Sequence, residues 1–251
     1  MVRHFTPSSI RGAGIAMGVA WLLSGCATAV SSNGPKPSDP QDAAAAYTRL
    51  GKAYLAENNQ PRAQQALEHA LELDPGDGDA LEGLALLYQR QREFELADTF
   101  FQRALEAAPE TTRIRNNYAA LLYQLKRYAA ACEQLDIASQ DITYTNRAQL
   151  FANLGQCRMT TNDIDAAQAA YRRALDINGS DARSLLALAE IDHTQGDDER
   201  AWERLQRYFT VAGTSADSLR LASDIASAQG DATRAAFYRQ QLDGSRGEQT
   251  P

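Results

Sequence analysis

The fold is decided by the stretch Tyr47–Pro75 (YTRLGKAYLAENNQPRAQQALEHALELDP), whose pattern returns 34 residues later as Leu81–Pro109 (LEGLALLYQRQREFELADTFFQRALEAAP). In each stretch a leucine is followed by a small residue, an alanine stands twelve positions further on, and a proline closes the pattern. The apolar residues between these markers fall at the i, i+3, i+4 and i+7 spacing of one helix face. The stretch therefore predicts two amphipathic helices, and the proline predicts where the second one stops.

The same pattern organises the chain from residue 44 onward, because three series of small residues share one register at spacings of 34, 34, 36, 34 and 34. The series are Ala63, Ala97, Ala131, Ala167, Ala201, Ala235; Gly51, Ala85, Ala119, Gly155, Ala189, Ser223; and Ala70, Ala104, Ala138, Ala174, which gives way to Tyr208 and Leu242. The period and pattern resemble the tetratricopeptide repeat. We expect six units, 44–77, 78–111, 112–147, 148–181, 182–215 and 216–244, with two extra residues in the loop Asp141–Asn146 and a frayed tail, 245–251.

The fold class expected from these repeats is all-α, a right-handed superhelical solenoid. Small residues at the helix crossings allow close backbone approach, and the larger apolar residues fill the remaining space. One unit cannot bury its apolar stripe alone, so each unit depends on its neighbours in the stack.

The first residues predict export and lipidation. Arg3 and Arg11 precede a short apolar run, Gly12–Leu23, which is the pattern of a secretory signal peptide over residues 1–25. The run ends in Leu23-Ser24-Gly25-Cys26, which resembles the bacterial lipobox, and Cys26 would carry the lipid. Residues 26–43 then form the lipidated cysteine and a flexible tether rich in Ser, Pro and Gly. By resemblance to Gram-negative lipoproteins, Ala27 implies sorting to the outer membrane, with the chain on its periplasmic face.

The charge balance limits the partners. The full chain carries −7, and without its two N-terminal arginines the mature chain has 23 basic and 32 acidic residues, or −9. An acidic chain is a poor binder of nucleic acid or of anionic lipid headgroups, so membrane attachment would come from the lipid.

The sequence offers no catalytic, cofactor-binding or metal-binding set, and we expect a non-enzymatic protein without a small-molecule substrate. His69 and His193 lie in different units, with no zinc-spaced Cys/His set and no phosphate-binding loop. Cys132 and Cys157 fall on helices expected to pack together; a disulfide and two buried thiols are both compatible with that placement.

A binding function would then depend on a surface. The first helices of the units are expected to line a concave groove, with Lys52, Leu55, Leu86, Asn116 and Tyr123 among the residues that point into it. Their mixture of apolar and amide side chains suits an apolar peptide or helix.

The sequences of particular units resemble those of the type IV pilus biogenesis/stability lipoprotein family (PilF/PilW type). The resemblance rests on Asn116-Asn117-Tyr118-Ala119, Asn153-Leu154-Gly155-Gln156-Cys157, Leu185–Ala189 and Gln206-Arg207-Tyr208, together with the lipobox and repeats. It implies a pilotin that binds the secretin subunit of the type IV pilus machine and promotes its localisation and multimerisation at the outer membrane, on which twitching motility depends.

The resemblance also implies that the first units contact the secretin, which directs attention to Leu50, Tyr54, Leu55 and Leu86. The alternative is a tetratricopeptide lipoprotein scaffold that recruits periplasmic peptidoglycan hydrolases or proteases.

Overall fold

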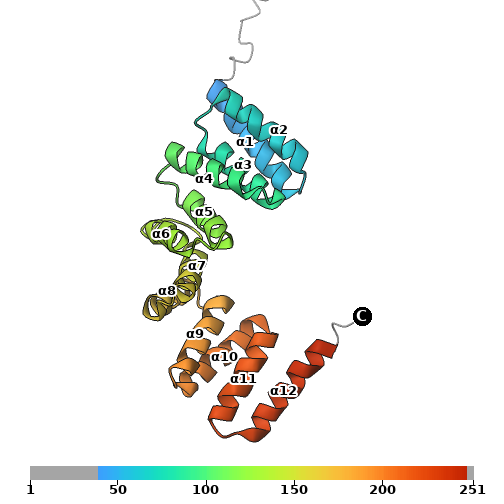
Figure 1. Ribbon diagram of the computed structural model, residues 1–251, viewed down its shortest axis with the longest axis vertical. Coiled ribbons are helices and arrows are strands. Elements are labelled where there is room, and N and C mark those ends of the chain that lie inside the picture. The colour runs from blue at the N-terminus through green and yellow to red at the C-terminus, as the bar shows by residue number, and fades with distance from the viewer. Residues whose placement is uncertain (1–38, 248–251) are drawn as a thin grey trace, which may run out of the picture. The chain divides into compact units, whose positions relative to one another are not determined.

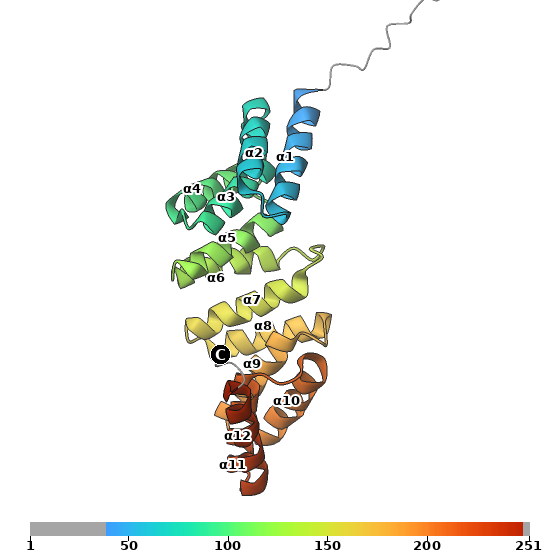
Figure 2. The same ribbon diagram turned by 90° about the vertical axis from the view of Figure 1, so that its right-hand side faces the viewer.

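The computed structural model describes residues 39–247, which form twelve α-helices and no strand. The helices are α1 (Pro40–Ala56), α2 (Gln60–Leu73), α3 (Gly78–Gln91), α4 (Phe94–Ala107), α5 (Thr112–Gln124), α6 (Tyr128–Ser139), α7 (Arg147–Thr160), α8 (Ile164–Ile177), α9 (Ala182–Thr194), α10 (Asp198–Ala212), α11 (Ala216–Ala228) and α12 (Ala232–Gly247). Each helix packs on the next one along the chain, so that six antiparallel pairs stack in sequence order (Figures 1 and 2). The prediction of an all-α tetratricopeptide solenoid is confirmed.

Two of the predicted limits need correction at the ends of the stack. α1 begins at Pro40, inside the predicted tether 26–43, and α12 continues to Gly247, inside the predicted frayed tail. Asp39 caps α1, since its side chain accepts a hydrogen bond from the Gln41 backbone N–H at 3.2 Å. Pro40 follows at a position where a missing N–H costs nothing. The predicted signal peptide, Cys26 and residues 248–251 lie outside the described residues.

The small residues lie at the crossings of the paired helices. A Cβ added to Gly155 in α7 would lie 2.7 Å from the ring of Tyr171 in α8, closer than carbon atoms approach one another. The ring therefore occupies the space that a side chain at Gly155 would need. This close packing holds the two helices of a unit together.

Each pair turns through one residue in the left-handed region of backbone space. These residues recur with the repeat and are Asn58, Arg92, Lys126, Asn162, Gly196 and Gly230, with φ between 58° and 83°. Glycine and asparagine adopt this conformation readily, whereas arginine and lysine do so at a cost. The turn is therefore fixed by the geometry of the pair rather than by one residue type.

The core is shared between neighbouring units. One cluster of buried side chains joins residues of α3 to α8, among them Phe101, Ile114 and Leu150, each without exposed surface. In the middle of this cluster a disulfide joins Cys132 of α6 to Cys157 of α7, with the two Cα atoms 5.6 Å apart. Of the two alternatives, the structure contains the disulfide, and it links the third unit to the fourth.

Candidate functional site

The inner wall of the stack, formed by the first helix of each unit, contains a network of charges at its N-terminal end. Glu82 of α3 has no exposed surface and pairs with Lys52 of α1, with Nζ 3.4 Å from Oε2, and with Arg113 of α5. Asn117 of α5 donates to the other Glu82 oxygen at 2.8 Å. Asp79 of α3 pairs with the same two cations, at 3.3 Å from Lys52. The two acids and two bases balance, so the wall offers no free charge clamp here.

The network shifts the proton affinity of its members. Partial burial lowers the pKa of the Lys52 amine, and the nearby Arg113 charge lowers it further. Burial alone would raise the pKa of the Asp79 carboxyl, but the positive charges of Lys52 and Arg113 outweigh it and hold the pKa below its usual range. Asp79 is therefore ionised at neutral pH and keeps the network intact.

Amide side chains continue the polar contacts toward the later units. Asn153 of α7 donates to Asn116 of α5 at 3.1 Å and accepts from Arg183 of α9 at 2.7 Å. Tyr123 of α5 lies 2.7 Å, hydroxyl to hydroxyl, from Thr160 of α7. Asn116, Tyr123 and Asn153 line a small hollow of about 140 Å³ whose apolar floor includes Leu135. On the inner wall, hydrogen bonds between polar side chains thus connect the first helices of neighbouring units.

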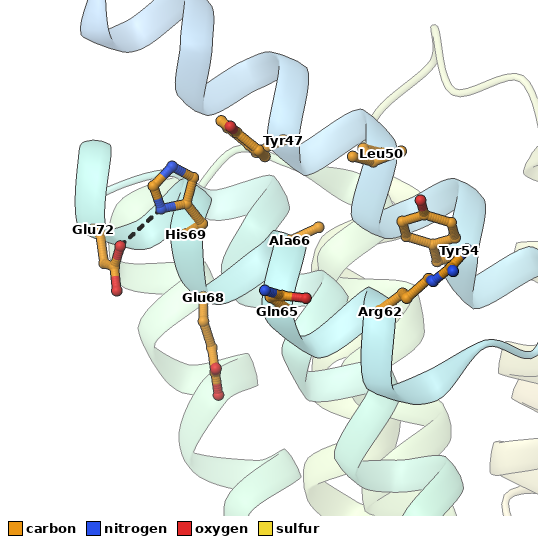
Figure 3. Close-up of a pocket in the computed structure, with 9 residues that line it drawn as sticks. All are labelled: Tyr47, Leu50, Tyr54, Arg62, Gln65, Ala66, Glu68, His69 and Glu72. Carbon is orange, nitrogen blue, oxygen red and sulfur yellow. Dashed lines mark hydrogen bonds and ion pairs between the residues drawn. The ribbon is translucent and has the colours of Figure 1, made fainter.

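A larger groove of about 630 Å³ lies between α1 and α2, in the first unit (Figure 3). We call it the end groove. Figure 3 shows Tyr47, Leu50 and Tyr54 along α1, with Arg62 and His69 of α2 on the side toward them and Glu68 and Glu72 directed away. The residues that line it are Tyr47, Leu50, Tyr54, Arg62, Gln65, Ala66, Glu68, His69 and Glu72.

The end groove has an apolar floor and a polar margin. The Tyr47 ring meets the His69 ring edge to face at 4.3 Å, and the Arg62 guanidinium lies over the Tyr54 ring at 5.8 Å. His69 Nδ1 is 2.8 Å from a Glu72 oxygen (Figure 3). Tyr47 and Leu50 nevertheless remain 37% and 41% exposed. Such exposure of adjacent large apolar side chains is typical of interaction sites.

The structure divides the predicted partner-binding residues between these two surfaces. Leu50 and Tyr54 lie in the end groove, whereas Lys52, Asn116 and Tyr123 lie on the inner wall. Leu86 is half-buried against the core cluster of α3 to α8. The prediction that Leu55 points into the concave groove is wrong: it is 5% exposed and belongs to the cluster that joins α1, α2 and α3, because α3 covers the end of α1.

Sequence reasoning missed most of the end groove. The sequence pattern assigns Tyr47, Arg62, Gln65 and His69 to no site. The signal that would have found them is their membership of the first unit, because within the described residues no helix precedes α1 to pack on Leu50.

Within residues 39–247 the structure contains no group of three or more His, Cys, Asp or Glu side chains arranged to hold a metal ion. None of the helices in that range has the length and apolar character needed to cross a membrane.

The paired helices, their crossings and their stacking define a tetratricopeptide repeat protein, and residues 54–116 and 148–181 match the tetratricopeptide repeat family. The chain is 35% identical to the type IV pilus assembly protein PilF of Pseudomonas aeruginosa over 170 residues, which covers 67% of this chain and 68% of that protein. It therefore belongs to the PilF family of type IV pilus proteins.

Solved structures agree with this assignment. The structure of Pseudomonas aeruginosa PilF superposes with a TM-score of 0.75 at 32% identity, covering 81% of this chain and 91% of that one. The structure of PilW, described as a widely conserved type IV pilus biogenesis factor, gives a TM-score of 0.70 at 28% identity, covering 80% and 92%. The chain is thus a relative of type IV pilus biogenesis factors over nearly the whole repeat domain.

Proposed function

We propose that the chain is a pilotin: an outer-membrane lipoprotein, acylated at Cys26, that binds the secretin subunit of the type IV pilus machine and promotes its localisation and multimerisation. The observation that carries the proposal is the exposed apolar end groove, on a chain that belongs to the PilF family. The lipobox Leu23-Ser24-Gly25-Cys26 supplies the membrane attachment in this proposal.

The mechanism is binding and tethering without a chemical step. Acyl chains on Cys26 would anchor at about 0.8 kcal/mol per buried methylene, so several chains hold the protein at the membrane in spite of its negative charge. The repeat domain, joined to the lipid through the residues before Pro40, then keeps a bound secretin subunit near the outer membrane. Confinement of the subunits to one surface raises their effective concentration and favours ring assembly.

The proposal is tested by deletion of the gene, followed by gel analysis of heat-resistant secretin multimers and by a twitching assay. We expect loss of multimers, accumulation of monomers and loss of twitching, all restored by the wild-type chain. Normal multimers and twitching in the deletion strain would refute the proposal. Recovery of a cell-wall hydrolase rather than the secretin with the purified chain would favour the scaffold alternative.

Lipidation is tested separately with Cys26→Ser. We expect the variant to appear in the soluble periplasmic fraction and to leave the secretin monomers away from the outer membrane. Continued outer-membrane fractionation of Cys26→Ser would show that the anchor lies elsewhere.

A further inference from the structure

The end groove is the face on which a preceding repeat would pack. The residues equivalent to Leu50 in the five later units are Leu84, Tyr118, Leu154, Leu188 and Ala222, and each is at most 8% exposed. Leu50 itself is 41% exposed. Within the described residues no repeat precedes α1, and its main contacts are with α2 and α3. The first unit thus carries the apolar surface of an inter-repeat junction without the helix that would cover it.

At the other junctions, the equivalent surface is covered by the second helix of the preceding unit. Leu67 and Ala70 of α2 share a buried cluster with Leu84 of α3, and Leu71 packs against that cluster. At a later junction Tyr171 of α8 shares a cluster with Leu188 of α9. The covering helices have a large apolar residue, followed three positions later by alanine in α2, α4, α6 and α8 and by Tyr208 in α10; in most of them a large apolar residue comes directly after.

We infer that the end groove seats an amphipathic helix of the partner, which takes the place of the second helix of a preceding repeat. This inference rests on the proposed function, in which the partner is the secretin subunit. The seated helix would present its apolar stripe to Tyr47, Leu50 and Tyr54 along the continuation of the interface that already joins the six units. Its flank over α2 would be polar, because Arg62, Glu68 and Glu72 line that side of the groove.

Neither the predicted tether nor a second copy of the repeat domain offers a suitable helix. Residues 27–38 contain one large apolar residue, Val30, and two prolines, so they lack the required stripe. A second copy would have to offer α12, but α12 has Arg239 and Asp243 where the covering helices have large apolar residues. A helix from a different protein is therefore the occupant that the groove fits.

The inference is tested by photo-crosslinking in cells that make the full-length lipoprotein, with a photoreactive phenylalanine analogue in place of Tyr47. We expect crosslinks to secretin residues that recur every three to four positions, as on one face of a helix. Crosslinks that alternate every second residue would overturn the inference, because they indicate an extended strand. Crosslinks formed from position 123 of the inner wall but not from position 47 would also overturn it. In both cases the pilotin function would survive, since it is judged by the deletion strain.

A matched pair of variants supports the crosslinking. Leu50 and Leu96 are leucines of similar exposure, 41% and 44%, on α1 and α4. Leu50→Glu should reduce the crosslink yield about tenfold or more, as expected for a central interface residue, whereas Leu96→Glu should leave it unchanged. Circular dichroism melting of both variants establishes that they are equally folded. An unchanged yield with folded Leu50→Glu would contradict the inference.

Discussion

Glu82 is a buried carboxylate in a network whose other charged members, Lys52, Asp79 and Arg113, are partly exposed. Its oxygens pair with Lys52 and Arg113 and accept from Asn117, residues of two other helices, so its removal would leave the two cations with Asp79 as their one carboxylate partner in this network. We expect Glu82→Ala to lower the free energy of unfolding by about 1–3 kcal/mol, less than for a fully buried pair because both cations are partly exposed. Urea unfolding measures the loss.

The control for Glu82 is Asp79→Ala. The Asp79 side chain is 53% exposed although it contacts the same two cations, so its removal should cost less than about 1 kcal/mol. Equal losses for the two variants would contradict the view that burial makes Glu82 the centre of the network.

Asp141, in the loop between the third and fourth units, makes the stability depend on acid pH. Its carboxylate accepts hydrogen bonds from the hydroxyls of Thr112 at 2.6 Å and Thr143 at 2.7 Å, which lower its pKa to about 2. A depressed pKa means that the unfolded chain binds the proton more readily, so this contribution is present above pH 3.8 and is lost as the pH falls toward 2.

Asp141→Asn should therefore be less stable than the wild type at pH 7, and the difference should shrink between pH 4 and pH 2. Urea midpoints of both proteins across this range measure the effect. A difference that stays constant with pH would show that the Asp141 carboxylate does not titrate in this way.

At the scale of the elements, the turn inside each unit depends on a residue with positive φ. Gly196 has φ of +83° and no atom near the position of an added Cβ, so an alanine there would be strained by the backbone alone. We expect Gly196→Ala to lower the free energy of unfolding by about 1 kcal/mol. Gly179→Ala is the matched control, because Gly179 lies in a loop without positive φ and an added Cβ would make only ordinary contacts. Equal thermal melting of the two variants would refute the argument.

The helix pairs could be predicted from the sequence because small residues at a fixed spacing report directly on close helix crossings. Where a single residue carries the conformation, the sequence is less informative. Arg92 occupies the left-handed turn of the second unit although its type does not indicate it. The start of α1 was missed for a similar reason, since the cap made by Asp39 and Pro40 lies outside the repeat pattern.

The site was harder to predict than the fold, because a repeat motif does not show which units lack a neighbour. Leu50 and Leu84 have the same place in their units, but α2 packs on α3 and buries Leu84, whereas within the described residues no helix precedes α1 and Leu50 is exposed. Leu55 shows the opposite case: its place in the helix suggested the groove, but the contact between α1 and α3 buries it. Burial in a repeat protein thus depends on the stack and not only on the unit.

For the whole repeat domain, the disulfide is the one covalent link between units within the described residues apart from the chain itself. It spans 25 residues, and closing a loop of this size in the unfolded chain is worth about 3 kcal/mol. We expect the double variant Cys132→Ser with Cys157→Ser to unfold at a clearly lower urea concentration. A reductant should shift the wild type by a similar amount and leave the double variant unaffected. A wild-type midpoint that does not respond to complete reduction would contradict this prediction.

The end groove and the entry of the chain into the repeat domain share one helix, since α1 begins at Pro40 and carries Tyr47, Leu50 and Tyr54. A mechanical force between a partner bound in the end groove and the residues before Pro40 would therefore act on the first unit alone. The other five units would not transmit this force. They could therefore unfold locally or bind further proteins without release of the partner.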